Sequence, residues 1–346
     1  MMPDNRKERK KILIINVNWL GDVIFSSPFI RAVRKTYPDS YIACVTPPGC
    51  RDVLAANSRL DELIILDENG HEKSFLGKIR FALKLRKKRF DAAFILHRSF
   101  TRALMTVLAG IKERVGYDTK KRGALLTKRL APPSGNIHKV EYFLKLAEAV
   151  GGDISKKNYE FFITGPDRVR AVCILEAAGI NCNDRIAILN PGGNWEPKKW
   201  PAGRFSSLAD TLIEKYGIKI VITGAERDKV LAGEISRGMK NKAVSLCGRT
   251  SIRELAAVLE RAKLVISGDS GPMHIGVSVG TNVVALFGPT SAEITGPYGN
   301  GNYAIVKGNV NCEVPCYDSA CNDNRCMKSI TVGNVMDVIE DRGYLN

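Results

Sequence analysis

The stretch LVISGDSGPMH, residues 264–274, contains the pattern that decides the fold. Leu264–Ser267 is a short apolar run, typical of a parallel strand that is buried on both faces. A glycine-rich turn follows, and a helix is expected over Met273–Val279 with Pro272 near its first turn. A strand that passes through a glycine turn into a helix is the repeating unit of α/β folds.

The same alternation recurs along the chain, on both sides of a polar stretch that runs from Gly151 to about Asp184 and holds one short helix, Asp167–Ala178. Before it, strands are predicted at Lys11–Val17, Tyr41–Thr46, Leu63–Leu66 and Ala92–Leu96, with helices from the turn at residues 18–22 to Tyr37 and at Phe75–Lys88, Thr101–Gly110 and His138–Val150. After it, strands are predicted at Ile186–Asn190, Ile218–Thr223, Ala243–Leu246 and Asn282–Phe287, with helices at Gly203–Tyr216, Arg227–Lys240 and Ile252–Arg261. Each half therefore predicts a doubly wound parallel sheet.

The chain of 346 residues is longer than one hydrophobic core usually supports, which favours two domains. We expect an N-terminal Rossmann-like domain over residues 1–165 and a second one over residues 166–346, with the carboxyl ends of both sheets facing a central cleft. The last helix, about residues 332–341, is expected to pack back on the N-terminal domain. Hydrophobic residues make up 45% of the chain, so it should be folded throughout.

The positive charge of the chain is concentrated in its first half. The formal net charge is +16, and residues 1–165 hold 31 Lys and Arg against 17 Asp and Glu, a net of +14. The basic runs are Arg6-Lys7, Arg9-Lys10-Lys11, Arg86-Lys87-Lys88-Arg89 and Lys120-Lys121-Arg122. Such runs can face nucleic acid, anionic lipid or a phosphorylated substrate, although for any single run an ordinary solvated face is the favoured interpretation.

No apolar stretch approaches the length of a membrane span, and no signal-peptide core is present, so a cytoplasmic protein is expected. Its nine cysteines predict reduced thiols. Four of them, Cys312, Cys316, Cys321 and Cys326, form a late cluster. Their spacing lacks the tight pairs of compact metal sites, which favours packing thiols over a zinc or iron–sulfur site. No metal site and no cofactor are predicted.

The turn Asp269-Ser270-Gly271-Pro272-Met273-His274 is the strongest candidate for ligand binding. It opens a helix directly after a strand, and a helix N-terminus offers unpaired N–H groups and partial positive charge. A diphosphate suits such a position. The alternative is that Asp269 or Ser270 is a plain helix N-cap.

Three further motifs follow strands of the second half. They are Asn190-Pro191-Gly192-Gly193-Asn194-Trp195 with Lys198 downstream, Thr223-Gly224-Ala225-Glu226, and Phe287-Gly288-Pro289-Thr290. A lysine beside a glycine turn can neutralise a leaving diphosphate, and a carboxylate such as Glu226 can accept hydrogen bonds from ribose hydroxyls. An exposed charged loop is the alternative for the lysine segment.

In the first half, Leu20-Gly21-Asp22 follows the first predicted strand. An aspartate at this position can take a proton from an acceptor hydroxyl. Alternatively, Asp22 caps the helix that follows.

The chain contains an ordered set of motifs: Leu20-Gly21-Asp22 with Pro28, Pro191-Gly192-Gly193, Lys198 with Trp200-Pro201, Gly224-Ala225-Glu226, and Asp269–His274 through Phe287-Gly288-Pro289-Thr290. This set is similar to the motifs of the ADP-heptose:lipopolysaccharide heptosyltransferases, glycosyltransferase family 9. The resemblance covers nearly the whole chain. It implies a GT-B fold and inverting, metal-independent transfer of heptose from ADP-heptose to inner-core lipopolysaccharide. It also implies that Asp22 is the general base, that Lys198 faces the phosphates, and that Glu226 contacts the adenosine ribose.

The resemblance extends to the acceptor side. The segments Arg98-Ser99-Phe100, Ala109-Gly110-Ile111 and Arg114-Val115-Gly116-Tyr117 look most like the second heptosyltransferase. The predicted catalytic residues are Asp22 and Lys198. The predicted donor-binding residues are Gly192, Gly193, Asn194, Glu226, Asp269, Ser270, Gly271, Pro272, Met273 and His274, and the predicted acceptor-binding residues are Gly21, Arg98, Ser99, Arg114, Lys120, Lys121 and Arg122.

The predicted partners are an ADP-sugar donor, an anionic lipopolysaccharide acceptor, and the cytoplasmic surface of the inner membrane as a peripheral contact. One departure from the family is Gly193-Asn194, where some members carry hydroxyl residues, so backbone N–H groups would contact phosphate there. A nucleotide-sugar epimerase of the same architecture is the alternative enzyme. A nucleic-acid-binding protein is the alternative that the charge suggests, but no helix-turn-helix or zinc finger accompanies it.

Overall fold

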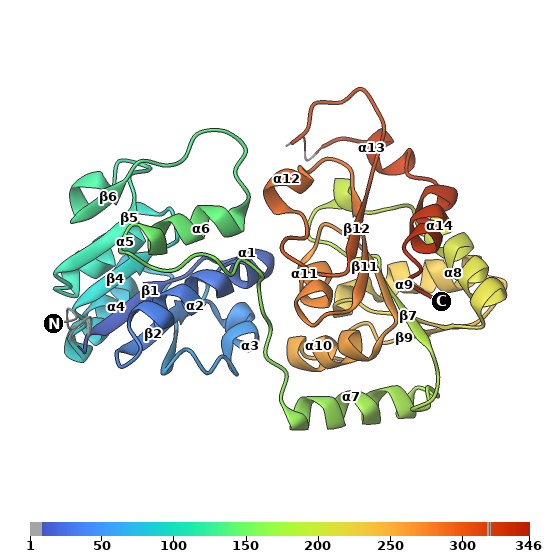
Figure 1. Ribbon diagram of the computed structural model, residues 1–346, viewed down its shortest axis with the longest axis horizontal. Coiled ribbons are helices and arrows are strands. Elements are labelled where there is room, and N and C mark those ends of the chain that lie inside the picture. Colours follow the sequence, from blue (N-terminus) through green and yellow to red (C-terminus); the bar gives the residue numbers. More distant parts are fainter. Residues whose placement is uncertain (1–8, 317, 319) are drawn as a thin grey trace, which may run out of the picture. The chain divides into compact units, whose positions relative to one another are not determined.

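The computed structural model describes residues 9–316, 318 and 320–346, and the chain divides into two compact units, Met1–Glu160 and Phe161–Asn346 (Figure 1). The division falls shortly before the predicted boundary at residue 165. Glu160 belongs to the first unit because it forms ion pairs with Arg31 (2.6 Å) and Arg59 (2.8 Å). The predicted basic pair Arg6-Lys7 lies outside the described residues.

The first unit is built on a six-stranded parallel sheet in the order β3-β2-β1-β4-β5-β6. The strands are β1 (Lys11–Ile15), β2 (Tyr41–Thr46), β3 (Glu62–Ile65), β4 (Ala92–Ile95), β5 (Glu113–Tyr117) and β6 (Lys128–Leu130). The chain builds outward from β1 in one direction and then from β4 in the other. The topological switch point, where open α/β sheets bind ligands, therefore lies between β1 and β4.

Helices cover both faces of this sheet. They are α1 (Leu20–Phe25), α2 (Ser27–Thr36), α3 (Arg51–Leu54), α4 (Phe75–Lys88), α5 (Phe100–Leu108) and α6 (Lys139–Glu148). On one face, Phe81 of α4 and Met105 of α5 pack in a common core with Leu13 of β1. On the other face, Phe29 of α2 meets Phe94 of β4 with ring centroids 5.4 Å apart, and α6 packs against α2.

The single helix predicted up to Tyr37 is two helices, α1 and α2. The chain bends at Ser26, whose hydroxyl donates to the carbonyl of Val23 at 2.7 Å. Pro28 lies in the first turn of α2, where its missing N–H costs nothing because the first N–H groups of a helix have no partner within it.

The second unit repeats the architecture, with strand order β12-β11-β10-β7-β8-β9, all parallel. The strands are β7 (Ile186–Asn190), β8 (Lys219–Ile222), β9 (Ala243–Ser245), β10 (Leu264–Gly268), β11 (Asn282–Phe287) and β12 (Tyr303–Lys307). Its switch point lies between β7 and β10. The strands β5, β6 and β12 were not predicted. Strands β5 and β6 begin with charged residues and β12 ends with one, so their apolar pattern is obscured.

The helices of the second unit are α7 (Gly165–Ala177), α8 (Ala202–Tyr216), α9 (Lys229–Gly238), α10 (Ile252–Arg261), α11 (Gly271–Ser278), α12 (Ala292–Thr295), α13 (Arg325–Lys328) and α14 (Val332–Asp341). The final helix packs within the second unit. There α14 places Val335, Met336 and Ile339 in the core and contacts α8, β11 and β12. Its apolar stripe is needed there to cover the sheet.

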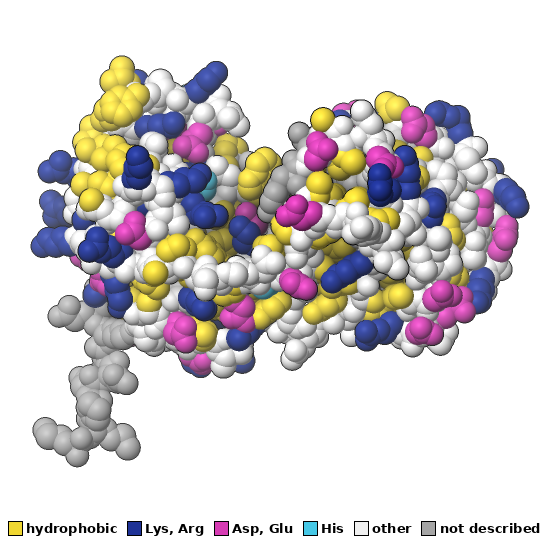
Figure 2. All heavy atoms as spheres, turned by 90° about the horizontal axis from the view of Figure 1, so that it is seen from above, with side chains coloured by type: hydrophobic (Ala, Val, Ile, Leu, Met, Phe, Trp, Pro, Cys, Tyr) yellow, Lys and Arg dark blue, Asp and Glu magenta, His cyan; other side chains and the backbone are white. Residues whose placement is uncertain are grey.

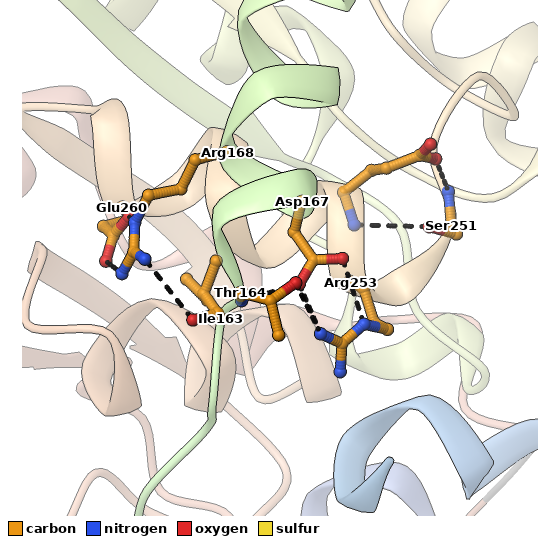
Figure 3. Close-up of polar contacts among 8 residues, drawn as sticks. Ile163, Thr164, Asp167, Arg168, Ser251, Arg253 and Glu260 are labelled. Atoms are coloured by element: carbon orange, nitrogen blue, oxygen red, sulfur yellow. Dashed lines mark hydrogen bonds and ion pairs between the residues drawn. The ribbon is translucent and has the colours of Figure 1, made fainter. Parts of the chain in front are cut away.

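The first helix of the second unit, α7, is fastened to α10 by three arginine–carboxylate pairs. Arg168 makes two 2.7 Å hydrogen bonds to Glu260, and Arg253 pairs with Asp167 (Figure 3). Arg170 donates to Glu254 at 2.7 Å. Asp167 also accepts from the backbone N–H of Thr164 at 2.7 Å, which closes a capping box at the start of α7. The first turn of α7 is therefore held against α10.

Within the described part of the chain, no helix combines the length and the apolar character that a membrane span needs.

Candidate functional site

The motifs predicted to bind the donor lie on neighbouring loops of the second sheet. Lys198 belongs to the loop after β7, Asp269 directly follows β10, and Glu226 belongs to the loop after β8. Because the three strands are parallel and adjacent in the sheet, their carboxyl ends share one edge. The switch point between β7 and β10 thus brings the lysine and aspartate motifs together.

An ion pair joins these two loops. The Nζ of Lys198 lies 2.7 Å from Oδ2 of Asp269, and the Asp269 side chain is only 7% exposed while that of Lys198 is 25% exposed. The hydroxyl of Thr295 donates to the same carboxylate at 3.4 Å, and Nε2 of His274 lies 3.8 Å from Oδ1. The ammonium group is therefore held at the carboxyl edge and still reaches solvent.

Asp269 remains ionised under all ordinary conditions. Burial raises its pKa, but the His274 side chain and the charge of Lys198 outweigh burial and bring the pKa to about 2. A carboxylate repels a diphosphate, so Asp269 does not fit the role of a direct phosphate ligand. It fits the role of a positioning residue for Lys198.

The remaining residues of this turn divide into those at its surface and those in its interior. Ser270 is the N-cap of α11, and its hydroxyl lies 2.9 Å from that of Ser267. Gly271 and Pro272 are half-buried and form the first turn; Pro272 has no N–H, and the N–H of Gly271 has no partner within the helix. Met273 and His274 are buried. Only the start of the predicted donor loop is thus open to a ligand.

Two glycines allow the loops after β7 and β8 to close around one buried carboxylate. A Cβ on Gly192 would lie 2.5 Å from the Asp228 carboxylate, and one on Gly224 would lie 2.8 Å from the Asp228 Cβ. Asp228 in turn accepts from the N–H of Ala225 at 2.8 Å. The sequence motif singled out the glycines but not Asp228, the residue that makes them necessary.

The outer residues of these loops are exposed. Glu226 is exposed and forms a 2.6 Å ion pair with Lys229. Asn194 accepts a hydrogen bond from Arg227, and Gly193 has open space where a Cβ would stand. Side-chain oxygens and backbone groups of both loops are therefore accessible to a ligand at this edge.

In the first unit, Asp22 lies in the first turn of α1, just after β1. The N-cap of this helix is Trp19, so Asp22 does not occupy the capping position that was the alternative for it. Burial, and after it the charge of Asp22, raise the pKa of the Cys50 thiol to about 11. Asp22 and its neighbour Gly21 are half-buried at the switch point of the first sheet.

A buried arginine that was not predicted fixes the loop before Asp22. Arg102 of α5, 1% exposed, donates to the carbonyl of Asn16 at 3.1 Å, and its Nη2 donates to the side chains of Asn18 and Glu68 at 2.6 Å each. It is the only charged residue in the mostly apolar helix FTRALMTVL. That contrast is the signal by which the sequence could have revealed it.

His97, also missed, lies just after β4 beside this arginine. Burial lowers its pKa to about 4, and the positive charge of Arg102 adds to the effect. Its Nδ1 accepts from the N–H of Ser99 at 3.1 Å, which leaves Nε2 as the donor of a neutral ring. The first switch point therefore holds a neutral imidazole next to a buried cation.

The predicted acceptor residues do not all lie together. Arg98 and Ser99 follow β4, and the exposed Lys120 and Lys121 follow β5, all at the carboxyl edge. Arg114 is a correction, because it lies near the start of β5, at the amino edge, where its Nε donates to the carbonyl of Leu125 at 2.6 Å.

Arg122 is the second correction. Its side chain is fully buried, and its guanidinium donates to the carbonyls of Tyr117 (2.8 Å) and His97. It therefore ties the ends of β4 and β5 together inside the unit and cannot belong to an exposed basic run.

The four late cysteines line one pocket of about 600 Å³, together with Pro197, Gly288 and Pro289. Packing describes Cys326, which is buried, but not Cys312, which is exposed. All nine cysteines are free thiols. Among the residues that the structure describes, no three His, Cys, Asp or Glu side chains are placed to share a metal ion. That catalysis needs no metal stays a prediction.

Two Rossmann-like units, one with a lysine–carboxylate pair beside an open helix N-terminus, are the architecture of GT-B glycosyltransferases. The family model "Glycosyltransferase family 9 (heptosyltransferase)" matches residues 78–325, and the chain belongs to this family. Lipopolysaccharide heptosyltransferase 2 of Escherichia coli strain K12 is 28% identical over 302 residues, covering 83% of this chain and 85% of that protein.

Solved structures agree with this assignment. The glycosyl transferase family 9 protein from Veillonella parvula DSM 2008 superposes with a TM-score of 0.90 and 26% identity, covering 99% of this chain and 98% of that one. The E. coli ADP-heptose lps heptosyltransferase II has the same fold, with a TM-score of 0.81 and 22% identity over 96% of this chain and 98% of that one.

Proposed function

We propose that this protein transfers heptose from ADP-heptose to the inner core of lipopolysaccharide and that it adds the second heptose. Membership of family 9 and the similarity to relatives named heptosyltransferase 2 support this substrate class. The observation that carries the proposal is the Lys198–Asp269 pair, which holds an ammonium group beside the open start of α11. A leaving diphosphate needs this arrangement of positive charge.

On the donor side, the diphosphate of ADP-heptose binds at the start of α11. The N–H groups of its first turn and the Lys198 ammonium compensate the charge that develops on ADP as the bond to the anomeric carbon breaks. Asp269 keeps Lys198 in place through their 2.7 Å contact. The exposed carboxylate of Glu226 accepts hydrogen bonds from the ribose hydroxyls.

On the acceptor side, the Asp22 carboxylate removes the proton from a heptose hydroxyl of the acceptor. The hydroxyl oxygen attacks the anomeric carbon from the face opposite ADP, so the configuration at that carbon inverts. Arg98, Ser99, Lys120 and Lys121 bind the carboxylates and phosphates of the acceptor core. Charge compensation comes from protein groups, and the reaction as proposed uses no metal.

The charge distribution supports an anionic, membrane-anchored acceptor. The net charge of +14 over residues 1–165 places the cations in the unit that contains Asp22. Such a surface concentrates an anionic substrate, and screening by salt weakens it. We place the enzyme at the cytoplasmic face of the inner membrane, where its acceptor is anchored.

The decisive experiment is transfer from ADP-heptose to two purified acceptors, read by mass. One acceptor carries only Kdo on lipid A, and the other already carries a first heptose. A gain of one heptose on the second acceptor alone is expected, with activity retained in EDTA. Gain on the first acceptor alone would reassign the step, and gain on neither would remove ADP-heptose as the donor.

Incubation with donor alone separates transfer from epimerisation. A transferase gives at most slow hydrolysis, whereas conversion of free ADP-heptose to an epimer would favour the alternative enzyme.

A further inference from the structure

The outer faces of α4 and α5 form a surface that the proposed chemistry does not use. The two helices pack side by side on the same face of the first sheet. This α4–α5 surface consists of the apolar residues Phe75, Leu76, Leu83, Phe100 and Leu108 and the cations Arg80, Lys84 and Lys87, all exposed. On the first unit, at the left of the view, Figure 2 shows hydrophobic side chains gathered beside Lys and Arg side chains.

Helix α4 has one exposed side and one buried side. Leu76, Arg80, Leu83 and Lys87 recur at i, i+4, i+7 and i+11 and therefore share one side of the helix. The other side carries Phe81 and Leu85, which are buried in the core. Leu76, 63% exposed, and Leu83, 47% exposed, thus contribute nothing to the core of the unit.

The outer side of α5 adds an apolar row. Phe100, Leu104 and Leu108 are spaced four residues apart, and all three are at least partly exposed. Arg102, the one charged residue of this helix, points inward and is 1% exposed. A row of large apolar side chains without any charge therefore borders the basic stripe of α4.

The cations of α4 lack neutralising carboxylates. Between Lys73 and Phe90 the sequence has eight Lys and Arg and no Asp or Glu. Lys88 is paired with Glu62 at 2.7 Å, but Arg80, Lys84 and Lys87 form no ion pair with any residue that the structure describes. Positive charge is thus left for an external partner.

We propose that the α4–α5 surface docks the protein on an anionic lipid bilayer, a proposal that rests on the proposed function because the acceptor is anchored in lipid. The apolar row of α5 and the leucines of α4 enter the boundary between headgroups and acyl chains, while the lysine and arginine stems extend to anionic headgroups. Nucleic acid would leave the apolar row in water, and a neutral protein surface would leave the cations unpaired. A bilayer with negative headgroups both removes the apolar row from water and pairs with the cations.

Co-sedimentation of the full chain with vesicles tests this surface. Wild-type protein should bind vesicles that contain phosphatidylglycerol and not vesicles of phosphatidylcholine alone. The variant Leu76→Asp with Leu83→Asp, and separately Arg80→Glu with Lys87→Glu, should each lower the partition coefficient by at least about tenfold. These side chains are exposed, so the variants should keep the wild-type unfolding temperature.

Matched substitutions in the second unit control for charge and hydrophobicity. Val169 and Val230 are 63% and 71% exposed, so Val169→Asp with Val230→Asp makes the same chemical change away from the surface. Arg237→Glu with Lys242→Glu makes the same change of charge. Both controls should bind anionic vesicles within about twofold of wild type. Equal loss in the controls and in the α4–α5 variants would overturn the proposal.

Transfer to a water-soluble acceptor without acyl chains separates this proposal from the proposed function. The α4–α5 variants should keep wild-type turnover on that acceptor. If no acceptor gains heptose while selective vesicle binding persists, the proposed function fails and the docking surface stands. If wild type forms dimers that Leu76→Asp with Leu83→Asp converts to monomers without any effect on vesicle binding, the surface belongs to a second copy and the proposal is wrong.

Discussion

The two units share one strand order but differ in the sign of the charges buried at their functional edges. In the first unit, the buried anchors are Arg102 and Arg122, which donate to backbone carbonyls at the carboxyl ends of β1, β4 and β5. In the second unit, the anchors are the carboxylates Asp228 and Asp269. The same topology is thus stabilised by opposite electrostatics.

This difference shows that one strand order can hold charged groups of opposite sign at the carboxyl edge of its sheet. A buried carboxylate such as Asp269 holds a cation, Lys198, at the edge, where it suits a diphosphate. A buried arginine such as Arg102 holds the loop before α1 and leaves the edge to a carboxylate, Asp22. Four predictions test this division, in order of decreasing effect.

The largest effect is expected from Asp22→Asn, which removes the proposed base and leaves the shape of the loop. Turnover with saturating substrates should fall by about a thousandfold, because a positioned general base contributes on this scale. Donor affinity, measured by calorimetry, should stay within about twofold. Asp52→Asn is the control, since Asp52 also lies half-buried in the first turn of a helix of the same unit. Near-normal turnover of Asp22→Asn would remove the proposed role of the first unit.

Lys198→Ala tests the cation of the second unit. Turnover should fall by about a hundredfold, because one preorganised charge at a leaving group is worth about 3 kcal/mol. Asp269→Asn should have a smaller effect, and the double variant should be no worse than Lys198→Ala, since both changes disrupt one pair. Lys199→Ala changes the adjacent lysine, which is paired with the exposed Glu196, and should be nearly neutral. Additive losses would show that Asp269 acts independently of Lys198.

Arg102→Met tests the buried cation of the first unit through stability. Urea unfolding should show a loss of about 3 kcal/mol, because Glu68 and two loop oxygens lose their donor. Lys88→Met breaks the more exposed pair with Glu62 and should cost less than about 1 kcal/mol. Equal costs for the two variants would mean that the burial of Arg102 contributes little to the free energy of unfolding.

The smallest effect concerns His97, whose pKa in the folded state, about 4, lies below its ordinary value of 6.5. Between these values the unfolded chain binds more protons, so stability is complete above pH 6.5 and decreases as the pH falls toward 4. Between pH 7.5 and pH 4.5, wild type should lose about 1 kcal/mol more than His97→Gln, with allowance for partial solvent screening. Urea unfolding at the two pH values measures this, and identical losses would contradict the lowered pKa.

The alternation of strands and helices was predictable because parallel strands buried on both faces are continuous apolar runs. The bounds of β2, β7, β11, α4, α10 and α14 agree with the predicted ranges, and most other elements differ by a few residues. The break at Ser26 and the packing of α14 were not predictable. The first depends on a side-chain hydrogen bond, and the second on which sheet needs an apolar cover.

The residues of the candidate site also divide into those that the sequence reveals and those that only the fold reveals. Glycine turns and a helix start are local patterns, so the loops that contain Lys198, Glu226 and Asp269 could be found from sequence. The roles of Arg102 and His97 arise from contacts between loops that only the fold brings together. Arg122 was misassigned because a basic run does not reveal which of its members points inward.

The attachment of α7 to α10 also has a mechanical consequence. A force applied to the chain at residues 161–163 reaches Thr164 and passes through the pairs of Asp167 with Arg253 and of Arg168 with Glu260 into α10 (Figure 3). The chain leaving α10 becomes β10, and β10 ends at the turn that contains Asp269. Residues 161–163 are therefore connected through α7, α10 and β10 to the turn that contains Asp269, the residue that holds Lys198.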